Sequence, residues 1–379
     1  MSINEPPNTF PLARRHPVPS FYCRHVIDQE EHLKRFVSDV ERAEWLALDT
    51  EADSLHAYPE KLCLIQVSLP GCDRLVDPLA GMDLNEFFTA INQHTILMHG
   101  ADYDIRLFKM GHNFVPNRIF DTMLAARLTG RTQFGLSNLV KDILGVQLEK
   151  SSQKANWARR PLTPKMEEYA RNDTIHLRDL VNALEAELRK NNREEWHRQE
   201  CDRLVRDNSV IKEPDPDQVW RIKGSAKLVA RALAVLREIW YWRETEARKR
   251  NRPPFFVLSP DTMIKMAMAA GEEKPIAQLL PQRMPDHRKY SVQKSVKHGM
   301  QLKESECPLR HKAPPRKHIS PAQKKRMAEI QEHRDRQARN LQIDPTIIAS
   351  RSTMIRLACE AEDVFEVILP WQRELLGES

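Results

Sequence analysis

The C-terminal half of the chain contains a gapless internal repeat, in which residues recur 91 positions further along. Repeated sequence implies repeated structure, so we predict two copies of one small helical domain. We place the first copy at residues 218–300 and a second, more divergent copy at residues 320–379. A basic, Pro-containing linker at residues 301–319 joins them. The matched residues include Arg243 with Arg334, Pro254 with Pro345, Ser259 with Ser350 and Thr262 with Thr353.

The first half of the chain has another pattern, in which short β-branched or aromatic runs alternate with helical stretches. From Asp121 onward the pattern is helical, so we predict an α/β domain over residues 21–207. Pro214 and Pro216 break a polar linker at residues 208–217, and a flexible Pro-rich arm at residues 1–20 precedes the domain. The predicted strands are Phe21–Val26, Trp45–Leu48, Leu62–Leu69, Arg74–Val76 and Ile96–His99.

Local signals predict helix starts and core positions. Asp28, with Glu31 three residues later, resembles a capping box that opens a helix. Asp83 could cap a second helix, and Thr163 caps a third that begins at Pro164. In the first helical domain, the expected core residues are Leu236, Trp240, Trp242, Phe255 and Phe256.

Charge and cysteine content limit the partners and the compartment. The net charge of +6 permits a polyanionic partner without requiring one. The six cysteines form no Cys-x-x-Cys pair, which argues against a zinc ribbon and favours reduced thiols in the cytoplasm. Because no apolar run reaches the roughly 18 residues of a membrane span, we expect no membrane contact.

Three acidic motifs suggest phosphodiester chemistry. Asp49 and Glu51 follow an apolar strand and alternate to one face, Asp104 opens a helix after another strand, and Tyr169 and Asp173 share a helix face. Two divalent ions held by clustered carboxylates could activate water and offset phosphate charge. Each motif alone also has an ordinary structural reading: a turn carboxylate, an exposed Tyr–Asp pair, or a charge at a helix N-terminus, which Asp102 could equally supply.

Together, the motifs resemble those of DEDD nucleases of the tyrosine-containing DEDDy subtype. Asp49 to Glu51, His99 to Asp104 and Tyr169 to Asp173 stand in the order of the three exonuclease motifs. The segments Leu64 to Gln66, Val76 to Pro78, and Trp157 with Arg160 to Leu162 are similar to ribonuclease D and nuclear exosome exonucleases. The resemblance implies a ribonuclease H-like core with a mixed sheet flanked by helices, followed by all-α HRDC domains (helicase and RNase D C-terminal).

The resemblance also implies a mechanism and a substrate. Asp49, Glu51, Asp104 and Asp173 would hold two Mg²⁺ or Mn²⁺ ions, and a neutral Tyr169 would orient the attacking water. RNA would lose nucleoside 5′-monophosphates from its 3′ end, chiefly in tRNA precursors with 3′ tails. We expect a monomer that needs no nucleotide cofactor. The candidate substrate contacts are Leu55, His56, Tyr58, Gln66, His99, Trp157 and Arg160.

The sequence leaves alternatives to this hypothesis. A DNA 3′→5′ exonuclease would carry the same carboxylates, and a non-catalytic RNA-binding scaffold could keep the fold without metals. The basic segment from Lys303 to Arg326 could be a solvated linker or an RNA-binding tract. Because every catalytic motif precedes the linker, we expect deletion after Asn208 to spare hydrolysis of short unstructured RNA.

Overall fold

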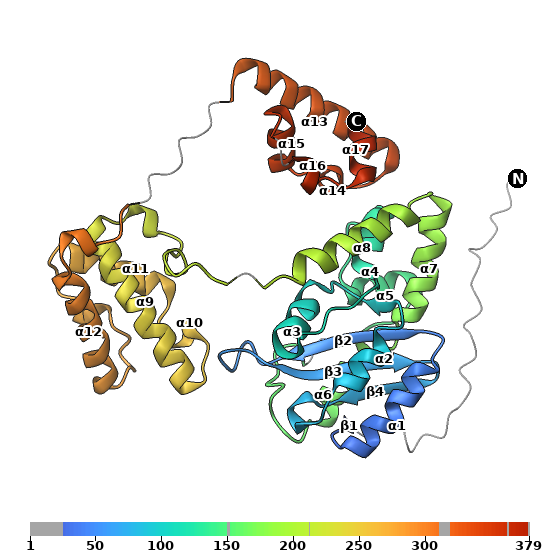
Figure 1. Ribbon diagram of the computed structural model, residues 1–379, viewed down its shortest axis with the longest axis horizontal. Coiled ribbons are helices and arrows are strands. Elements are labelled where there is room, and N and C mark those ends of the chain that lie inside the picture. The colour runs from blue at the N-terminus through green and yellow to red at the C-terminus, as the bar shows by residue number, and fades with distance from the viewer. Residues whose placement is uncertain (1–25, 150–151, 212, 311–318, 362–363, 378–379) are drawn as a thin grey trace, which may run out of the picture.

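The computed structural model describes residues 26–149, 152–211, 213–310, 319–361 and 364–377. Its six-stranded sheet has the order β1-β4-β3-β2-β5-β6 (Figure 1). β3 is antiparallel to β2 and β4, whereas the other neighbours are parallel, so the sheet is mixed, as predicted. The strands are β1 (Val26–Ile27), β2 (Leu46–Ala52), β3 (Leu62–Leu69), β4 (Cys72–Val76), β5 (Ile96–Met98) and β6 (Ile119–Asp121).

Helices cover both faces of this sheet. On one face α1, α2 and α3 bury an apolar cluster that includes Phe36, Phe87 and Phe108. On the other, α6 packs against β3 and β4, and α7 packs against β5. We call this α/β domain, which holds all the predicted catalytic motifs, the catalytic domain. Its helices are α1 (Glu30–Glu41), α2 (Asn85–Ile91), α3 (Asp102–His112), α4 (Thr122–Leu128), α5 (Leu136–Leu144), α6 (Pro164–Asn172), α7 (Leu177–Lys190) and α8 (Glu194–Asn208).

Some predicted boundaries hold and others are wrong. Thr163 caps α6 and Pro164 begins it, as predicted. Gln29, not Asp28, is the N-cap of α1, and Leu84 follows Asp83 as the N-cap of α2. β6 was not predicted, because a strand of three residues shows too little alternation. Most of the predicted strand Phe21–Val26 lies outside the described residues.

The first helical domain has its own core. Trp220, Leu236 and Met263 lie in a cluster built only from this domain, with Trp240 and Trp242 packed partly against it. Phe255 and Phe256 were expected in this core, but the residues are 47% and 61% exposed, and their rings contact each other at an interplanar angle of 44°. The helices are α9 (Ala230–Arg250), α10 (Pro254–Val257), α11 (Pro260–Gly271) and α12 (Asp286–Gln301).

The C-terminal domain reproduces this arrangement 91 residues later. Asn251 and Gln342 end the two long helices with left-handed backbones, and Ser259 and Ser350 cap the equivalent later helices. The sequence repeat is therefore a structural repeat. The helices are α13 (Pro321–Leu341), α14 (Pro345–Ile348), α15 (Arg351–Ala358), α16 (Val364–Val367) and α17 (Pro370–Leu376).

The C-terminal domain packs against the catalytic domain beside α8 (Figure 1). The Trp371 ring stacks on Trp196 with 4.7 Å between centroids. Arg193 donates hydrogen bonds to the carbonyl oxygens of Leu128 at 2.6 Å and Leu341 at 2.7 Å. Leu128 is the last residue of α4, and Leu341 is the last residue of α13. These contacts join the two domains into one apolar core.

No helix within the described residues is long and apolar enough to cross a membrane.

Candidate active site

β2 presents two of the four acidic side chains. Side chains alternate along a strand, so Asp49 and Glu51 share a face with Ala47, while Leu48 and Thr50 point to the opposite face. Ala47 belongs to the cluster on the α7 side and Leu48 to the cluster on the α1 side. The alternation predicted from the sequence is thus the one that the strand adopts.

α3 supplies the third carboxylate. Asp104 is 6% exposed and accepts a hydrogen bond from the Thr50 hydroxyl across 54 residues of sequence. Asp102, in the same first turn, is half exposed and pairs with Arg106 at 3.2 Å. Of the two acidic residues that open α3, Asp104 is therefore the one that faces the interior.

α6 brings Tyr169 and Asp173 over the sheet. The Thr163 side chain accepts from the backbone N–H of Met166 at 3.3 Å and fixes the start of the helix. Asp173 is the C-cap and keeps helical backbone angles, which preserves the four-residue spacing from Tyr169. Behind Tyr169 lies the buried Trp157 ring, with 6.0 Å between centroids.

The four carboxyl groups interact electrostatically. Burial, then the charges of Asp104, Asp173 and Glu51, hold the pKa of Asp49 well above its usual range. Burial and the charges of Asp173 and Asp104 raise the pKa of Glu51 to about 9. Burial also raises the pKa of Asp104 to about 6 and, with Asp104, that of Asp173 to about 7. Groups separated by up to 124 residues of sequence therefore lie close together.

Tyr169 is influenced by the same charges. Burial, then Asp173, Glu51 and Asp49, raise the pKa of its phenol above the ordinary value. The hydroxyl is therefore neutral near pH 7, and it can donate or accept one hydrogen bond rather than act as a strong base.

The donor set fits a divalent cation. Among the described residues, no three His, Cys, Asp or Glu side chains already form a group closed enough to hold a metal ion. The four carboxylates nevertheless offer hard oxygen ligands, which Mg²⁺ and Mn²⁺ prefer. Mutual repulsion of buried carboxylates is unfavourable without a counter-ion, and a divalent cation would remove it.

The loop between β2 and β3 carries the first three candidate substrate contacts. Asp53 closes its base by accepting from the backbone N–H of Lys61 at 2.7 Å. At its tip Leu55 and His56 are exposed, and His56 contacts the carbonyl oxygen of Lys154 at 3.2 Å. Tyr58 instead donates its hydroxyl to Glu244 of the first helical domain, under the Arg248 guanidinium. Tyr58 is therefore a domain contact in this structure.

Two further candidates are held by protein groups in this structure. Arg160 is exposed, and its guanidinium donates to the Asp77 carboxylate and to the carbonyl oxygens of Cys63 and Trp157. Trp157 is 1% exposed and belongs to the apolar cluster beneath α6.

The remaining two candidates are polar side chains held within the fold. His99 contacts the Thr122 hydroxyl at 2.9 Å, and burial lowers the pKa of its imidazole. Gln66 is fully buried beneath α6, within β3. Gln66 has no exposed surface for a direct contact with RNA in this arrangement, whereas His99 is partly exposed and stays a candidate contact.

Sequence analysis assigned no role to two residues that position the site. Thr50 is the donor to Asp104. Asp121 is fully buried and accepts from the backbone N–H groups of Ala101 at 2.8 Å and Met123 at 2.8 Å, which joins the starts of α3 and α4. Thr50 points away from Asp49 toward the other face, and its partner Asp104 lies 54 residues away in sequence, so no local pattern could have identified its role. Asp121 gave no local signal beyond helix capping.

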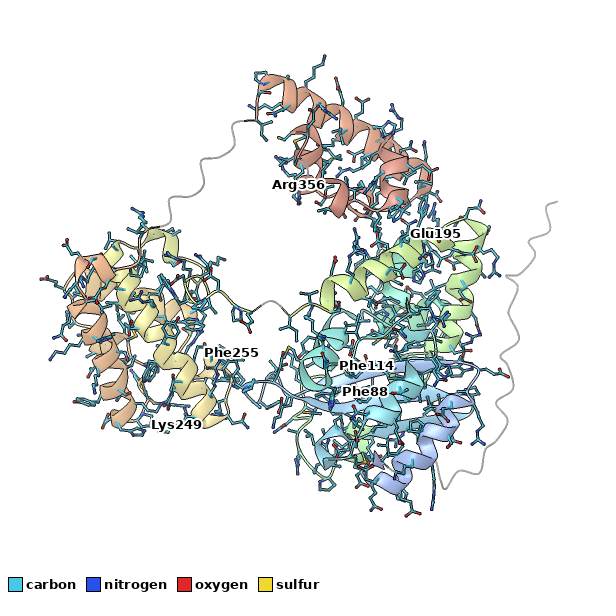
Figure 2. The ribbon with its side chains drawn as sticks, viewed as in Figure 1. Phe88, Phe114, Glu195, Lys249, Phe255 and Arg356 are labelled. Carbon is cyan, nitrogen blue, oxygen red and sulfur yellow. The ribbon has the colours of Figure 1, made fainter. Side chains whose placement is uncertain are left out.

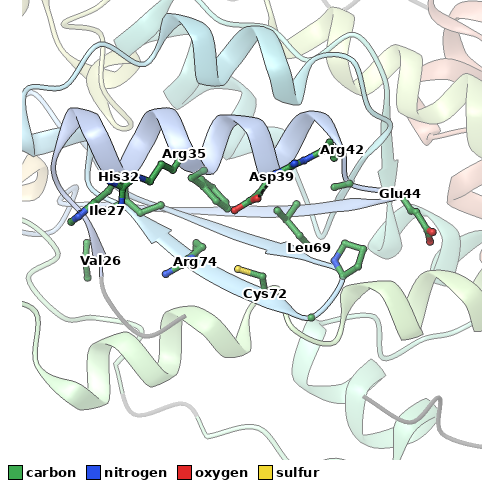
Figure 3. A pocket seen from close by; sticks show the side chains of 14 residues that line it. Val26, Ile27, His32, Arg35, Asp39, Arg42, Glu44, Leu69, Cys72 and Arg74 are labelled. Atoms are coloured by element: carbon green, nitrogen blue, oxygen red, sulfur yellow. Dashed lines mark hydrogen bonds and ion pairs between the residues drawn. The ribbon is translucent and has the colours of Figure 1, made fainter. Parts of the chain in front are cut away.

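A cavity of about 750 Å³ lies elsewhere, between α1 and the β3–β4 turn (Figure 3). Its lining includes Phe36, Arg42, Leu69 and Cys72 but none of the four carboxylates. Glu44, just before β2, lies at its rim, whereas Asp49 and Glu51 lie near the other end of that strand. The cavity is therefore separate from the acidic site.

Comparison with known proteins defines the class of this one. A family model described as 3′-5′ exonuclease matches residues 24–189, and an HRDC domain model matches residues 232–271. The chain is thus a 3′→5′ exonuclease that carries an HRDC domain. Ribonuclease D of Jannaschia sp. (strain CCS1) is 30% identical over 313 residues, which cover 79% of this chain and 80% of that protein. The chain therefore belongs to the ribonuclease D family, and it is a hydrolytic 3′→5′ exoribonuclease.

Solved structures agree with this placement. Escherichia coli RNase D, described as an exoribonuclease involved in structured RNA processing, aligns with a TM-score of 0.71 at 25% identity. The alignment covers 93% of this chain and 96% of that one. A protein from Bifidobacterium adolescentis has the same fold, with a TM-score of 0.80 at 23% identity over 94% of this chain and 95% of that one. Exonucleases of this fold use divalent metal ions.

Proposed function

We propose that this exoribonuclease trims the 3′ tails of structured RNAs, chiefly tRNA precursors, with two divalent metal ions. The observation that carries the proposal is the group of four carboxyl groups, Asp49, Glu51, Asp104 and Asp173, whose pKa values all lie above their usual range. Burial raises each of them, and the charge of Asp104 contributes to the other three. Divalent ions bound there would supply a nucleophilic water near neutral pH and offset the charge on the phosphate.

The protein side chains have separate tasks in this mechanism. Asp49, Glu51 and Asp173 would bind the ion that activates water, and Asp104, held by Thr50, would place the second ion. The neutral Tyr169 hydroxyl would orient the attacking water. The buried Trp157 would keep the Tyr169 ring in place from behind.

The first helical domain supports binding of single-stranded RNA near the site. Phe255 and Phe256 form an exposed pair, and α9 ends just before them on Arg248, Lys249 and Arg250. Exposed aromatic rings stack on bases, and basic side chains neutralise phosphates. Figure 2 shows Phe255 on the part of this domain nearest the catalytic domain, and Asn251 bonds the backbone of Tyr58 at 3.1 Å.

The compartment and assembly belong to the same proposal. The described cysteines Cys63, Cys201, Cys307 and Cys359 are free, which fits a reducing cytoplasm. The catalytic groups come from one chain, and we propose that the enzyme acts as a monomer.

The test is digestion of a 3′-tailed tRNA, with and without Mg²⁺, beside an RNA strand and a DNA strand of one sequence. We expect metal-dependent release of nucleoside 5′-monophosphates from the two RNAs. Loss of one positioned hydroxyl typically costs ~10²–10⁴-fold. Tyr169→Phe should therefore retain more activity than Asp173→Asn, which removes a metal ligand. Equal inactivity of the two variants, with normal metal binding by Tyr169→Phe, would contradict the metal-centred mechanism.

A further inference from the structure

Gln66 is an unusual residue in the centre of the sheet. β3 reads Leu-Cys-Leu-Ile-Gln-Val-Ser-Leu, and every side chain along it is buried. Gln66 is 0% exposed, and neither its amide nitrogen nor its amide oxygen has a hydrogen-bond partner among the described residues. A buried amide without partners is unfavourable. The side chain therefore needs a partner that none of the described residues supplies.

Strand register shows which polar group Gln66 can reach. Gln66 lies directly opposite Asp49 on β2 and opposite Leu75 on β4, so the three side chains form a row on one face. Along β3, the same face presents Leu64 and Ser68. Leu64 and Leu75 are apolar, so among the positions directly opposite Gln66 or next on its own strand face, Asp49 and Ser68 are the polar ones.

Ser68 already has its own partners. Its hydroxyl bonds the Asp73 carboxylate at 2.6 Å and the Thr174 hydroxyl at 2.8 Å. Directly opposed residues of an antiparallel pair have Cβ atoms about 4.5–5.5 Å apart. A glutamine amide spans that gap, so the Asp49 carboxylate lies within its reach.

Asp49 in turn needs a neutral donor. The charged side chains that act on Asp49 are Asp104, Asp173 and Glu51, all acidic. A carboxylate that binds a cation would still have oxygen lone pairs beyond those that bind metal. The Gln66 N–H groups can fill one of them without adding charge.

We propose that Gln66 is a positioning residue for the metal site. Its amide N–H donates to the Asp49 carboxylate when a divalent cation is bound and fixes the orientation in which that carboxylate binds the cation. The inference rests on the proposed function, because it assumes that Asp49 binds a metal ion. Hydrogen-bonding partners behind a metal ligand typically change metal affinity by 10–100-fold.

The competing explanation is a buried water that satisfies the amide independently of the site. In that case Gln66 affects packing alone, and its replacement leaves metal affinity unchanged. The two explanations differ in a binding constant that requires neither RNA nor turnover.

The experiment measures Mn²⁺ binding to the full-length protein by isothermal titration calorimetry, with the Tm recorded with and without Mn²⁺. Gln66→Met replaces the amide by an apolar side chain of similar length, and Gln66→Leu replaces it by a branched one. Two variants are used because the test needs only one of them to fold. We expect Mn²⁺ affinity to fall ~10–100-fold, while the metal-free Tm stays equal to wild type or rises.

Val67→Ala is the matched control. Val67 is the next residue of β3 and packs on the opposite face, in the cluster with Phe36. Its truncation should lower the Tm and leave Mn²⁺ affinity unchanged, which separates stability from metal binding. Wild-type affinity in both Gln66 variants overturns the role of Gln66. Absence of Mn²⁺ binding in the wild type would instead overturn the proposed metal site, and this inference with it.

Discussion

The two helical domains share a repeat but differ in what they contact. The first has a core of its own and reaches the catalytic domain through the contacts of Tyr58 with Glu244 and Asn251. The second shares one apolar cluster with the catalytic domain, centred on Trp371 and Trp196. The two copies therefore have equivalent helix boundaries, but only the second copy packs its apolar surface against the catalytic domain.

One repeated position shows the difference directly. Phe256 and Ile347 are equivalent in the 91-residue repeat. Phe256 is 61% exposed, whereas Ile347 is 9% exposed and lies in the cluster that contains Leu128. The surface that the second copy uses to dock on the catalytic domain is thus open in the first copy. This open surface is where we propose that RNA binds.

Deleting each domain should give the largest contrast. A chain that ends at residue 319 exposes Trp196 and its apolar neighbours, whereas replacing residues 218–310 with a flexible linker exposes no shared core. Because buried Trp truncations alone cost ~3–5 kcal/mol, we expect the first deletion to lower the catalytic domain Tm by roughly 10 °C or more. The second deletion should leave that Tm nearly unchanged.

Calorimetry together with hydrolysis of a short unstructured RNA would measure the contrast. We expected all residues after Asn208 to be dispensable for hydrolysis of a short unstructured RNA. Because the C-terminal domain shares an apolar core with the catalytic domain, only the first helical domain should be dispensable for it. Equal Tm values for the two deletions would remove the distinction between the domains.

Two buried tryptophans allow a matched comparison by point mutation. Trp371 is 2% exposed at the domain junction, and Trp220 is 1% exposed inside the first helical domain. Each change to Ala should cost ~3–5 kcal/mol. Trp371→Ala should lower the stability of the catalytic domain, but Trp220→Ala should lower only that of the first helical domain. Limited proteolysis would identify which domain opens, and opening of the catalytic domain by Trp220→Ala would count against the comparison.

The pH dependence of stability should separate the same two units. The folded-state pKa values of Asp104, Asp173 and Glu51, about 6, 7 and 9, exceed the unfolded values of about 4. The folded state therefore holds more protons, and stability falls as pH rises through these values. We expect the metal-free Tm of the catalytic domain to fall between pH 5 and about 9, with the transition of the first helical domain much less affected. Saturating Mg²⁺ should flatten the slope; an unchanged slope would argue that these carboxyl groups do not bind the ion.

Tyr58→Phe should have the smallest effect. It removes the hydroxyl that donates to Glu244, a loss of ~0.5–1.5 kcal/mol, while Glu244 keeps its pair with Arg243 at 2.8 Å. We expect a modestly higher KM for tailed tRNA and unchanged kinetics on a dinucleotide. A matching loss on the dinucleotide would show that Tyr58 contacts the reacting end of the RNA instead.

The sequence predicted the four carboxylates because their signals are local and combine in order. Alternation along β2, the first turn of α3 and the spacing along α6 each leave a readable pattern. Thr50 has the same local signal, but its role depends on Asp104, which is 54 positions away. Donor and acceptor pairs of that kind become visible only when the chain is folded.

Side chains with large functional groups were harder to interpret. Arg160 suggested a substrate contact, yet its guanidinium is paired with Asp77, which lies 83 positions away in the sequence. Phe255 and Phe256 had helical neighbours and suggested core, yet they are exposed. Amino-acid type indicates what a side chain can bind, and only tertiary structure decides whether protein or solvent lies beside it.

Arg193 has a consequence for how the enzyme searches for an RNA end. Arg193 donates hydrogen bonds to Leu128 in the catalytic domain and to Leu341 in the C-terminal domain. It thereby helps to hold together the two domains that precede and follow the first helical domain in the sequence. That domain is consequently tethered at both ends to one body, and its excursions are restricted to a small volume. RNA held by the domain would experience a high effective concentration of active site. A released 3′ end could then be recaptured before the RNA diffuses away, which favours removal of several nucleotides in each encounter.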